Sequence, residues 1–359
     1  MSNKKAISGS IGKMALVTII VIAILGAVLY VTKSGGTKAP PTHVNQSQIN
    51  NYVYCIGTSG TTSENQSYYA PLLDNGSVGA WQSTTPYPVG LTYAGCSIYQ
   101  GNIYCVGTFG NGEHTNQTYY APVSSSGIGQ WKPSTPYPVS FYHSGCAAYN
   151  GFLYCVGTES GAMTYTAYAS IGGSGIGTWQ TTTGYPEMGH SISCPIYNGT
   201  IYCIGVGNFP FIHSYYANVT SSGIGVWIRT ADYPVQPVDT SCTVSKSGYI
   251  YCVGTRSTAN KNESYYAQLT KQGITTWHKT TGYPIPIASN GCFINGNYIY
   301  CAGSANSNES TSVYYAPISS SGIGEWVQGT SYPIAFMNAY CAVPGYGGSL
   351  FGGGGPSTG

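Results

Sequence analysis

The sequence predicts an all-β fold, a six-bladed β-propeller with four-stranded blades, preceded by one N-terminal transmembrane helix. Two observations lead to this prediction. A unit of about 50 residues repeats six times, and a single long apolar run stands before the repeats. The composition agrees, because charged residues make up only 6% of the chain while Gly and Tyr are abundant, which favours short strands and tight turns over amphipathic helices.

The repeat is marked by a tryptophan that is followed six residues later by Tyr-Pro. Each unit has the same order of short β-rich segments separated by Gly- and Ser-rich turns, which predicts four strands per unit and one blade per unit. We expect the tryptophans to pack in the core between adjacent blades; a ring of sugar-stacking platforms is the alternative. The tryptophans are Trp81, Trp131, Trp179, Trp227, Trp277 and Trp326.

Ten of the twelve cysteines form pairs spaced nine or ten residues apart around a short turn. The turn Gln100-Gly101 places Cys96 directly opposite Cys105 in an antiparallel hairpin, within reach of a disulfide. Metal ligation by these cysteines is disfavoured, because no C-x-x-C pair occurs in the sequence. The other predicted hairpin disulfides are Cys146–Cys155, Cys194–Cys203, Cys242–Cys252 and Cys292–Cys301.

The two remaining cysteines lie in half-motifs at opposite ends of the repeats. Cys55 lies in a second strand that lacks a first strand, and Cys341 lies in a first strand that lacks a second. We therefore expect the C-terminal strand to pair with the N-terminal one in a composite blade, with a Cys55–Cys341 disulfide closing the ring. Disulfides require an oxidising compartment, which predicts that the repeats lie outside the cytoplasm.

An uninterrupted apolar stretch of eighteen residues runs from Met14 to Val31, long enough to cross a membrane as a helix. Three lysines precede it and two follow closely, so the positive-inside rule places residues 1–13 in the cytoplasm and the rest outside. We expect a retained anchor at 14–32; a cleaved secretory signal is the alternative, although no clear small-x-small cleavage pattern follows.

The other predicted boundaries follow from composition. Residues 33–50 lack apolar periodicity and are rich in Gly, Pro and polar residues, which indicates a flexible stalk. The repeats span 51–346, and a Gly-rich tail occupies 347–359.

The segment Lys4-Lys5-Ala6-Ile7-Ser8, followed by a Gly and the apolar run, resembles the processing site of archaeal type IV pilin-like proteins. The resemblance implies cleavage between Ala6 and Ile7 and assembly of the helix into a filament core. Lys13 departs from the pattern, because it places a charge inside the packing helix.

The blades themselves resemble Kelch-type repeats, with a second strand of the form Ile-Tyr-x-x-Gly, a third strand bearing Tyr and a fourth bearing Trp. The family's double glycine after the second strand is a single one here, as at Gly107-Thr108, and the cysteine pairs are a further departure. The resemblance implies a propeller with a binding role more than any particular chemistry.

No catalytic constellation is recognised, so we expect no enzyme, no metal and no cofactor. The turn before Trp131 lacks the aspartate of six-bladed sialidases, and Arg229 and Arg256 cannot form a three-arginine carboxylate clamp. The six histidines occupy dissimilar repeat positions, which disfavours a Kelch-class copper oxidase. A Ser-His-Asp triad would lack the strand-to-helix elbow that holds the serine.

The candidate binding residues are those that lead into the innermost strands, at the mouth of the central channel. They differ between blades although the scaffold repeats, as a pocket with distinct contacts would require; neutral loop variation is the alternative. His143 and Asp239 are the members most able to titrate or ligate. The full set is Tyr93, His143, His190, Asp239, Ser289 and Asn338.

Eight Asn-x-Ser/Thr sequons predict N-glycosylation, and three recur just before the third strand of a blade. The recurring ones are Asn65, Asn116 and Asn262, and Asn308 lies near the same place. We expect several of the eight to be modified. The others are Asn45, Asn75, Asn198 and Asn218.

These observations favour a single-pass membrane protein with an extracytoplasmic propeller that recognises a surface protein or glycan. The alternatives are a filament or envelope subunit that self-assembles through the N-terminal helix and, third, a carbohydrate-active enzyme. Nucleic acid is excluded as a partner, because residues 39–359 carry seven basic against ten acidic residues and lack a dense basic face.

Overall fold

The computed structural model describes residues 51–59, 63–91, 94–110, 113–159, 164–187, 190–206, 212–237, 240–255, 262–286, 291–303, 310–335 and 338–344. The expected cytoplasmic segment, transmembrane helix, stalk and Gly-rich tail lie outside the described residues. Within these ranges the structure contains no helix long and apolar enough to span a membrane.

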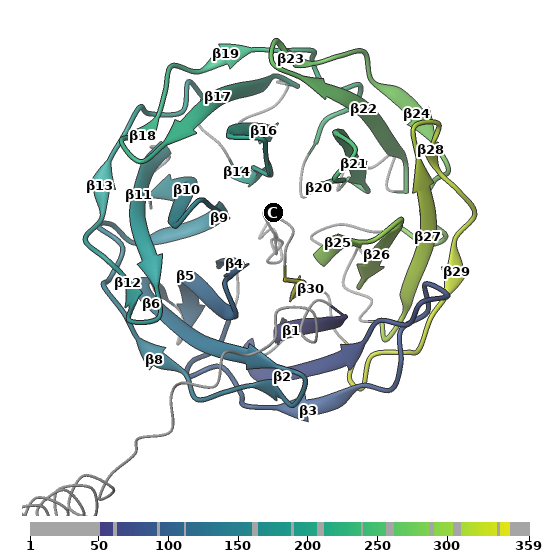
Figure 1. Ribbon diagram of the computed structural model, residues 1–359, viewed down its shortest axis with the longest axis horizontal. Helices are drawn as coiled ribbons and strands as arrows, with labels where there is room; N and C mark the ends of the chain where they lie inside the picture. The colour runs from purple at the N-terminus through teal and green to yellow at the C-terminus, as the bar shows by residue number, and fades with distance from the viewer. Residues whose placement is uncertain are drawn as a thin grey trace, which may run out of the picture. The chain divides into compact units, whose positions relative to one another are not determined.

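The strands of the described residues form six antiparallel sheets, arranged as blades around a common centre (Figure 1). The predicted six-bladed propeller is confirmed. Blade 1 is the composite blade, with the order β3-β2-β1-β30, so its innermost strand comes from the C-terminal end of the chain. Blades 2 to 6 follow in chain order, and in each of them the outer layer consists of two short segments.

The layers are as follows. The innermost strands are β30 (Asn338–Ala342), β4 (Gly95–Tyr99), β9 (Phe141–Tyr149), β14 (His190–Ser193) with β15 (Ile196–Tyr197), β20 (Ser241–Val244) and β25 (Gly291–Asn295). The second strands are β1 (Tyr52–Ser59), β5 (Asn102–Gly110), β10 (Phe152–Glu159), β16 (Thr200–Val206), β21 (Tyr249–Val253) and β26 (Tyr298–Ala302). The third strands are β2 (Ser63–Pro71), β6 (Glu113–Ser124), β11 (Thr164–Gly172), β17 (Ser214–Thr220), β22 (Ser264–Thr270) and β27 (Val313–Ser319). The outer strands are β3 (Gln82–Thr84), β7 (Gly127–Ile128) with β8 (Lys132–Pro133), β12 (Gly175–Ile176) with β13 (Gln180–Thr181), β18 (Gly223–Ile224) with β19 (Ile228–Arg229), β23 (Gly273–Ile274) with β24 (His278–Thr280), and β28 (Gly322–Ile323) with β29 (Val327–Gln328).

The two faces of the ring carry different connections. In blade 3 the innermost strand begins at Phe141, which pairs with Glu159 at the end of the second strand, and the third strand begins at Thr164 opposite Thr158. We call this end of the blades the loop face; it receives the segments that enter the innermost strands. The opposite end, the turn face, carries the tight turns between the first and second strands and between the third and outer strands.

The predicted hairpin register is confirmed by the turn residues. Gln100 and Gly101 both have positive φ, 45° and 75°, as a two-residue type I′ turn requires, and Cys96 then pairs directly with Cys105. Asn150-Gly151 and Asn198-Gly199 repeat this conformation. A turn of this type matches the twist of the flanking strands, so it holds the two cysteines in register.

All six predicted disulfides form. Cys55 pairs with Cys341 across β1 and β30, and the two residues are directly opposite in the ladder, which confirms ring closure through the composite blade. The hairpin disulfides are Cys96–Cys105, Cys146–Cys155, Cys194–Cys203, Cys242–Cys252 and Cys292–Cys301.

Each tryptophan ties its blade to the preceding one. The indole Nε1–H donates to a backbone carbonyl in the outer segment of the preceding blade, and at the closing interface Trp81 donates to Thr330 O at 3.0 Å. Trp131, Trp179, Trp227 and Trp277 are buried, as predicted for blade-core residues, whereas Trp81 and Trp326 are partly exposed. The other acceptors are the carbonyls of Thr85, Thr135, Thr183, Ala231 and Thr281.

The tyrosine of each Tyr-Pro pair packs edge-on against the tryptophan of the next blade, at centroid distances of 4.8 to 5.1 Å. Tyr332 makes this contact with Trp81, so the closing interface has the same geometry as the others. The constant spacing of Trp and Tyr-Pro in the sequence therefore comes from one aromatic contact repeated around the ring.

Hydroxyl groups supply the polar part of the blade interfaces. In blade 3, Thr182 Oγ1 accepts a hydrogen bond from Ile224 N at 2.8 Å and donates to Ile224 O at 3.0 Å. Second-strand tyrosines reach across in the same direction, as Tyr202 does when its hydroxyl donates to Thr270 O at 2.9 Å. These bonds satisfy the backbone groups of the turns between third and outer strands.

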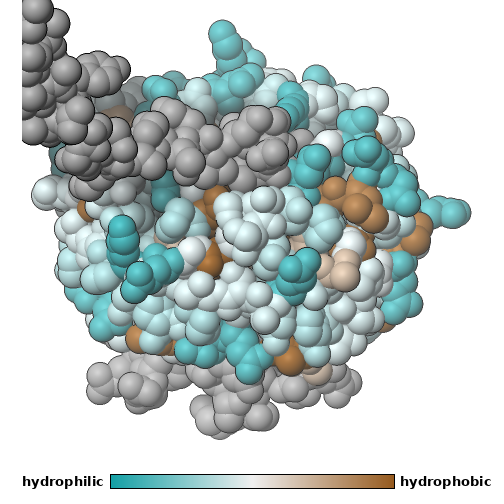
Figure 2. All heavy atoms as spheres, turned by 60° about the horizontal axis from the view of Figure 1, so that its bottom comes forward, coloured by the Kyte–Doolittle hydropathy of each residue, from teal (hydrophilic) through white to brown (hydrophobic). Residues whose placement is uncertain are grey.

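The surface seen in Figure 2, on the side of blade 1, is mostly hydrophilic or neutral, with hydrophobic residues in small separate groups. Leu73, Val226, Ile228 and Val327 are the large apolar side chains most exposed within the described residues.

Removing the closing disulfide should cost more stability than removing a hairpin disulfide. On the chain-entropy model a separation of 286 residues corresponds to about 5.5 kcal/mol and a separation of nine to about 2.5 kcal/mol. We expect Cys55→Ser/Cys341→Ser to lower the denaturation midpoint about twice as far as Cys96→Ser/Cys105→Ser, measured by circular dichroism. Equal losses for the two double variants would show that the ring is closed mainly by its non-covalent contacts.

Loss of the hydroxyl should lower the stability at one buried tyrosine and not at another. Tyr202→Phe removes the bond to Thr270 O and should cost about 1 kcal/mol in free energy of unfolding. Tyr233 is fully buried and its hydroxyl has no partner within the described residues, so Tyr233→Phe should leave stability unchanged or raise it. Urea denaturation of the two variants makes the comparison, and a larger loss for Tyr233→Phe would contradict it.

Candidate functional site

Three of the predicted channel-mouth residues lie within the described residues. His143 lies in β9, His190 begins β14 and Asn338 begins β30, so the structure places their backbones on innermost strands near the loop face. Strands β9 and β14 are neighbours around the centre, whereas β30 lies in blade 1 (Figure 1). Tyr93, Asp239 and Ser289 lie outside the described residues.

A second set of residues is formed by one tyrosine in each third strand. In every blade except blade 3 this tyrosine is the ladder partner of the second-strand cysteine. In blades 1 and 2 its hydroxyl donates to a neutral glutamine two residues earlier: Tyr68 to Gln66 Oε1 at 2.9 Å and Tyr119 to Gln117 Oε1 at 3.1 Å. These tyrosines also pack against the Tyr-Pro tyrosine of the preceding blade. In blades 4 and 5 the acceptor of this hydroxyl is a carboxylate instead of a neutral glutamine.

Blade 4 departs from this pattern most. In the other units the residue after Tyr-Pro is Val or Ile, packed against the core. In the third unit, whose Tyr-Pro segment packs against blade 4, this residue is Glu187. Glu187 Oε1 accepts from the Tyr215 hydroxyl at 2.8 Å and lies 2.5 Å from His213 Nδ1. Glu187 Oε2 is buried and has no hydrogen-bond partner in the described part of the chain. A carboxylate therefore occupies a position that elsewhere serves the core.

Arg229 and Asp232 extend this cluster along the outer strand. Arg229 Nε and Nη2 donate to the two carboxylate oxygens of Asp232 at 3.1 and 2.6 Å, which is a bidentate pair. Arg229 is also the ladder partner of Tyr215. Burial, together with the hydrogen bond to Glu187, raises the pKa of Tyr215 to about 12, so its hydroxyl stays protonated and donates.

Apolar residues are exposed on the same outer edge. Val226 is 77% exposed and Ile228 is 50% exposed, on either side of the buried Trp227. In blade 3 the corresponding positions are polar, Thr178 and Gln180. We call the combined surface the blade-4 rim (Figure 1, near β17 to β19). It consists of Glu187, His213, Tyr215, Val226, Ile228, Arg229 and Asp232.

Blade 5 carries a smaller charged group at the equivalent tyrosine. The Tyr265 hydroxyl donates to Glu263 Oε2 at 2.6 Å, and the other carboxylate oxygen accepts from Lys279 Nζ. The hydrogen bonds from Lys279 and then Tyr265 lower the pKa of Glu263. Burial, followed by the hydrogen bond to Glu263, raises the pKa of Tyr265. A carboxylate thus accepts the hydrogen bond of the third-strand tyrosine in blade 5 as well as in blade 4.

The blade-4 rim combines exposed apolar side chains with charged ones. Within the described residues no group of three or more His, Cys, Asp or Glu side chains is placed to hold a metal ion. Exposed apolar side chains beside charged ones are the composition of a protein-binding surface, in which an apolar centre is surrounded by polar groups.

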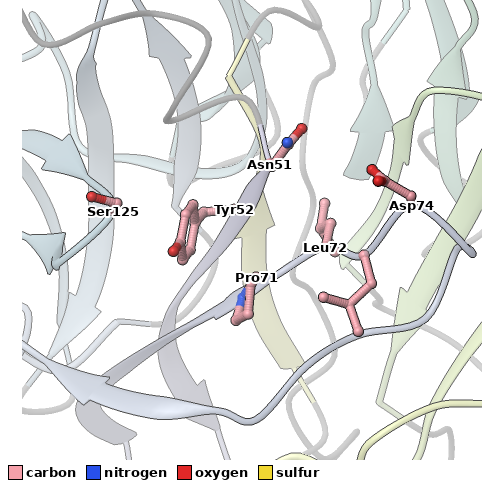
Figure 3. Close-up of a pocket in the computed structure, with 7 residues that line it drawn as sticks. Asn51, Tyr52, Pro71, Leu72, Asp74 and Ser125 are labelled. Carbon is pink, nitrogen blue, oxygen red and sulfur yellow. The ribbon is translucent and has the colours of Figure 1, made fainter.

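A pocket of about 500 Å³ lies on the turn face between blades 1 and 2. It is lined by Asn51, Tyr52, Pro71, Leu72, Leu73, Asp74 and Ser125. Figure 3 shows Ser125 and Asp74 at opposite sides of the pocket, with Tyr52 and Pro71 between them. The titratable residues among those that line it are Asp74 and Tyr52.

Comparison with known proteins gives the fold and no family. No family model and no curated protein matches the chain. The solved structure of YjhT is similar, with a TM-score of 0.57 and 11% sequence identity over 73% of this chain and 94% of that chain. At this identity the likeness shows the fold alone.

The blade-4 rim was not among the residues predicted from the sequence. A position-by-position comparison of the repeats could have found it, because Glu187 stands where the other units have Val or Ile. Its contact with His213 could not be predicted without knowing that each Tyr-Pro segment crosses to the next blade.

The lowered pKa of Glu263 predicts a pH-dependent contribution to stability. A carboxyl group with a depressed folded-state pKa stabilises the protein above its ordinary value of 4.5, and this contribution is lost as the pH falls through the folded-state pKa. We expect Glu263→Gln to lower the melting temperature at pH 7, with the difference from wild type disappearing in acid. Glu325→Gln, at an exposed position in blade 6, is the control. A difference that persists unchanged at low pH would contradict the assignment.

Proposed function

We propose that this protein is an extracytoplasmic recognition module of Kelch-like type, held at a membrane by residues 14–32, which binds a protein partner through the blade-4 rim. Six disulfides and the repeated interface contacts support a scaffold suited to an oxidising environment. The pilin-like processing between Ala6 and Ile7 stays a prediction of the sequence.

The observation that carries the proposal is the concentration of departures from the repeat in one blade. Glu187, His213, Val226 and Ile228 all differ in chemical type from the blade 2 or blade 3 residues at the same repeat positions. The aromatic contact that holds blades 3 and 4 together does not involve Val226 or Ile228, because it is made by Trp227 and Tyr185 as in the other blades. The departures therefore add surface chemistry without altering the scaffold.

A protein partner is favoured over a glycan by the exposed apolar pair. The aliphatic side chains of Val226 and Ile228 cannot form hydrogen bonds with the hydroxyl groups of a sugar, but they can pack against apolar side chains of a protein. The bidentate Arg229–Asp232 pair beside them is typical of the polar rim of a protein interface. The rim runs along the outer edge of blade 4, from Val226, which follows the turn between β17 and β18, to Asp232 after β19.

The proposal predicts site-specific cross-linking in intact cells. A photoreactive amino acid at position 226 or 228 should give a discrete cross-linked product with one protein, identified by mass spectrometry. The matched controls are the equivalent positions of blade 3, Thr178 and Gln180, which share the scaffold and lack the apolar pair. We expect no discrete product from them.

Three results would contradict this function. Equal cross-linking at all four positions would indicate nonspecific contact, and a ladder of products containing only this chain would favour the filament or envelope subunit. Binding of the full-length protein on a glycan array, lost in Arg229→Ala but unaffected by Val226→Ser, would indicate a glycan ligand instead.

A further inference from the structure

The described residues include six sequons, and they differ in what the Ser or Thr hydroxyl does. Transfer of a glycan to a folded chain requires an accessible asparagine amide, with the hydroxyl two residues later free to assist it. The sequons begin at Asn65, Asn75, Asn116, Asn198, Asn218 and Asn262; those at Asn45 and Asn308 lie outside the described residues.

The three recurring sequons have buried hydroxyl residues. Ser67, Thr118 and Ser264 are each at most 2% exposed. The same third-strand position holds buried Thr166 in blade 3 and Ser214 in blade 4, where no asparagine stands two residues earlier. The hydroxyl residue therefore belongs to the blade structure, and its recurrence does not indicate a glycan in each blade.

The amide at Asn116 is also engaged, because its Nδ2 donates to Tyr137 O at 3.0 Å. This bond ties the start of the third strand to the Tyr-Pro segment of the same blade. A glycan on Nδ2 would have to break it.

The sequons at Asn198 and Asn218 are exposed, but their hydroxyls bond elsewhere. Thr200 Oγ1, which belongs to the Asn198 sequon, donates to the side chain of Asn218 at 3.4 Å. Thr220 Oγ1, which belongs to the Asn218 sequon, pairs with Ser222 Oγ at 2.8 Å. Neither hydroxyl is bonded to its own asparagine.

Asn75 combines an exposed side chain with a hydroxyl bonded to its own amide. Asn75 Oδ1 accepts from Ser77 N at 3.0 Å and from Ser77 Oγ at 2.7 Å. Gly76 between them has a φ of +85°, and a Cβ there would meet the ring of Tyr298, so the turn holds a fixed conformation. Two hydrogen bonds to Oδ1 draw electron density from the carboxamide, which makes a proton on Nδ2 easier to lose.

We propose that Asn75 is an N-glycan acceptor, used in preference to the three recurring sequons. Nδ2 attacks the anomeric carbon of a sugar carried on a lipid-linked phosphate. The carbon–oxygen bond to phosphate breaks, the phosphate leaves with the electron pair, and Nδ2 gives up one proton to a base of the transferase. The assignment rests on the extracytoplasmic location in the proposed function, because lipid-linked sugar donors for asparagine act on exported chains.

A glycan on Asn75 would lie beside the turn-face pocket. Asn75 follows Asp74 and Leu73, which line the turn-face pocket, and Leu73 is 46% exposed. A glycan on Asn75 stands beside this pocket and shields the exposed Leu73 from other proteins. The blade-4 rim lies on a different blade, so the glycan leaves the proposed partner site open.

The test is site-resolved mass spectrometry of the full-length protein purified from its native membranes. We expect a glycopeptide containing Asn75 and unmodified peptides containing Asn65, Asn116 and Asn262. In Ser77→Ala the modification should fall to background, and in Ser77→Thr, which keeps the hydroxyl, it should remain. Asn218→Gln is the control and should leave the modification of Asn75 unchanged.

A Cys55–Cys341 peptide recovered from each variant without reduction shows that the ring has formed in an oxidising compartment. Unmodified Asn75 in a protein with this disulfide would overturn the glycan assignment and leave the location intact. Reduced cysteines in the native protein would contradict the location itself. Modification of all three recurring sequons, or of Ser77→Ala at the wild-type level, would show that the folded turn does not select Asn75.

Discussion

The pairing of β30 with β1 is the constraint on which the rest of the structure depends, because a propeller has no stable arrangement until its last blade meets its first. Here the meeting takes place inside one sheet, through a backbone ladder and the Cys55–Cys341 bond. The closing interface then repeats the contacts of the others, with Trp81 donating to Thr330 O and Tyr332 packing against Trp81. Strain from imperfect closure would be expected to weaken these contacts, and they are instead as short as the rest.

The repeated interface restricts which residue types can occur at the positions that form it. Three residues after the tryptophan, five blades have a Ser or Thr whose hydroxyl bonds the next blade, whereas blade 6 has Gly329 there. The following residue, Thr330, donates to Val78 O instead. The hydrogen bond from a hydroxyl to the next blade is thus kept, although the residue that makes it has moved by one. Each interface therefore needs at least one side-chain hydroxyl to satisfy the backbone groups of a turn that is shielded from solvent.

Features governed by local spacing could be predicted from the sequence, and features governed by contacts between blades could not. The turn Gln100-Gly101 sets the register of its hairpin, so the pairing of Cys96 with Cys105 followed from counting residues. The closing disulfide followed from two half-motifs. Glu187 and His213, in contrast, belong to different repeat units and meet because the Tyr185-Pro186 segment crosses to the next blade. The channel-mouth residues were predicted from their equivalent positions in the repeats. Of these residues, the structure places the backbones of His143, His190 and Asn338.

The energetic position of Glu187 separates a structural role from a functional one. A buried carboxylate oxygen without a partner costs free energy, and Val or Ile at the same place in other units buries apolar surface at no such cost. Its bonds to His213 and Tyr215 offset part of the penalty, but a scaffold built only to assemble or to persist would gain nothing from them. The same blade exposes Val226 and Ile228, which also reduces solubility without strengthening the ring. The buried carboxylate and the exposed apolar pair are both unfavourable, and the fold explains neither. A partner that covers the apolar pair and binds the charged cluster explains both.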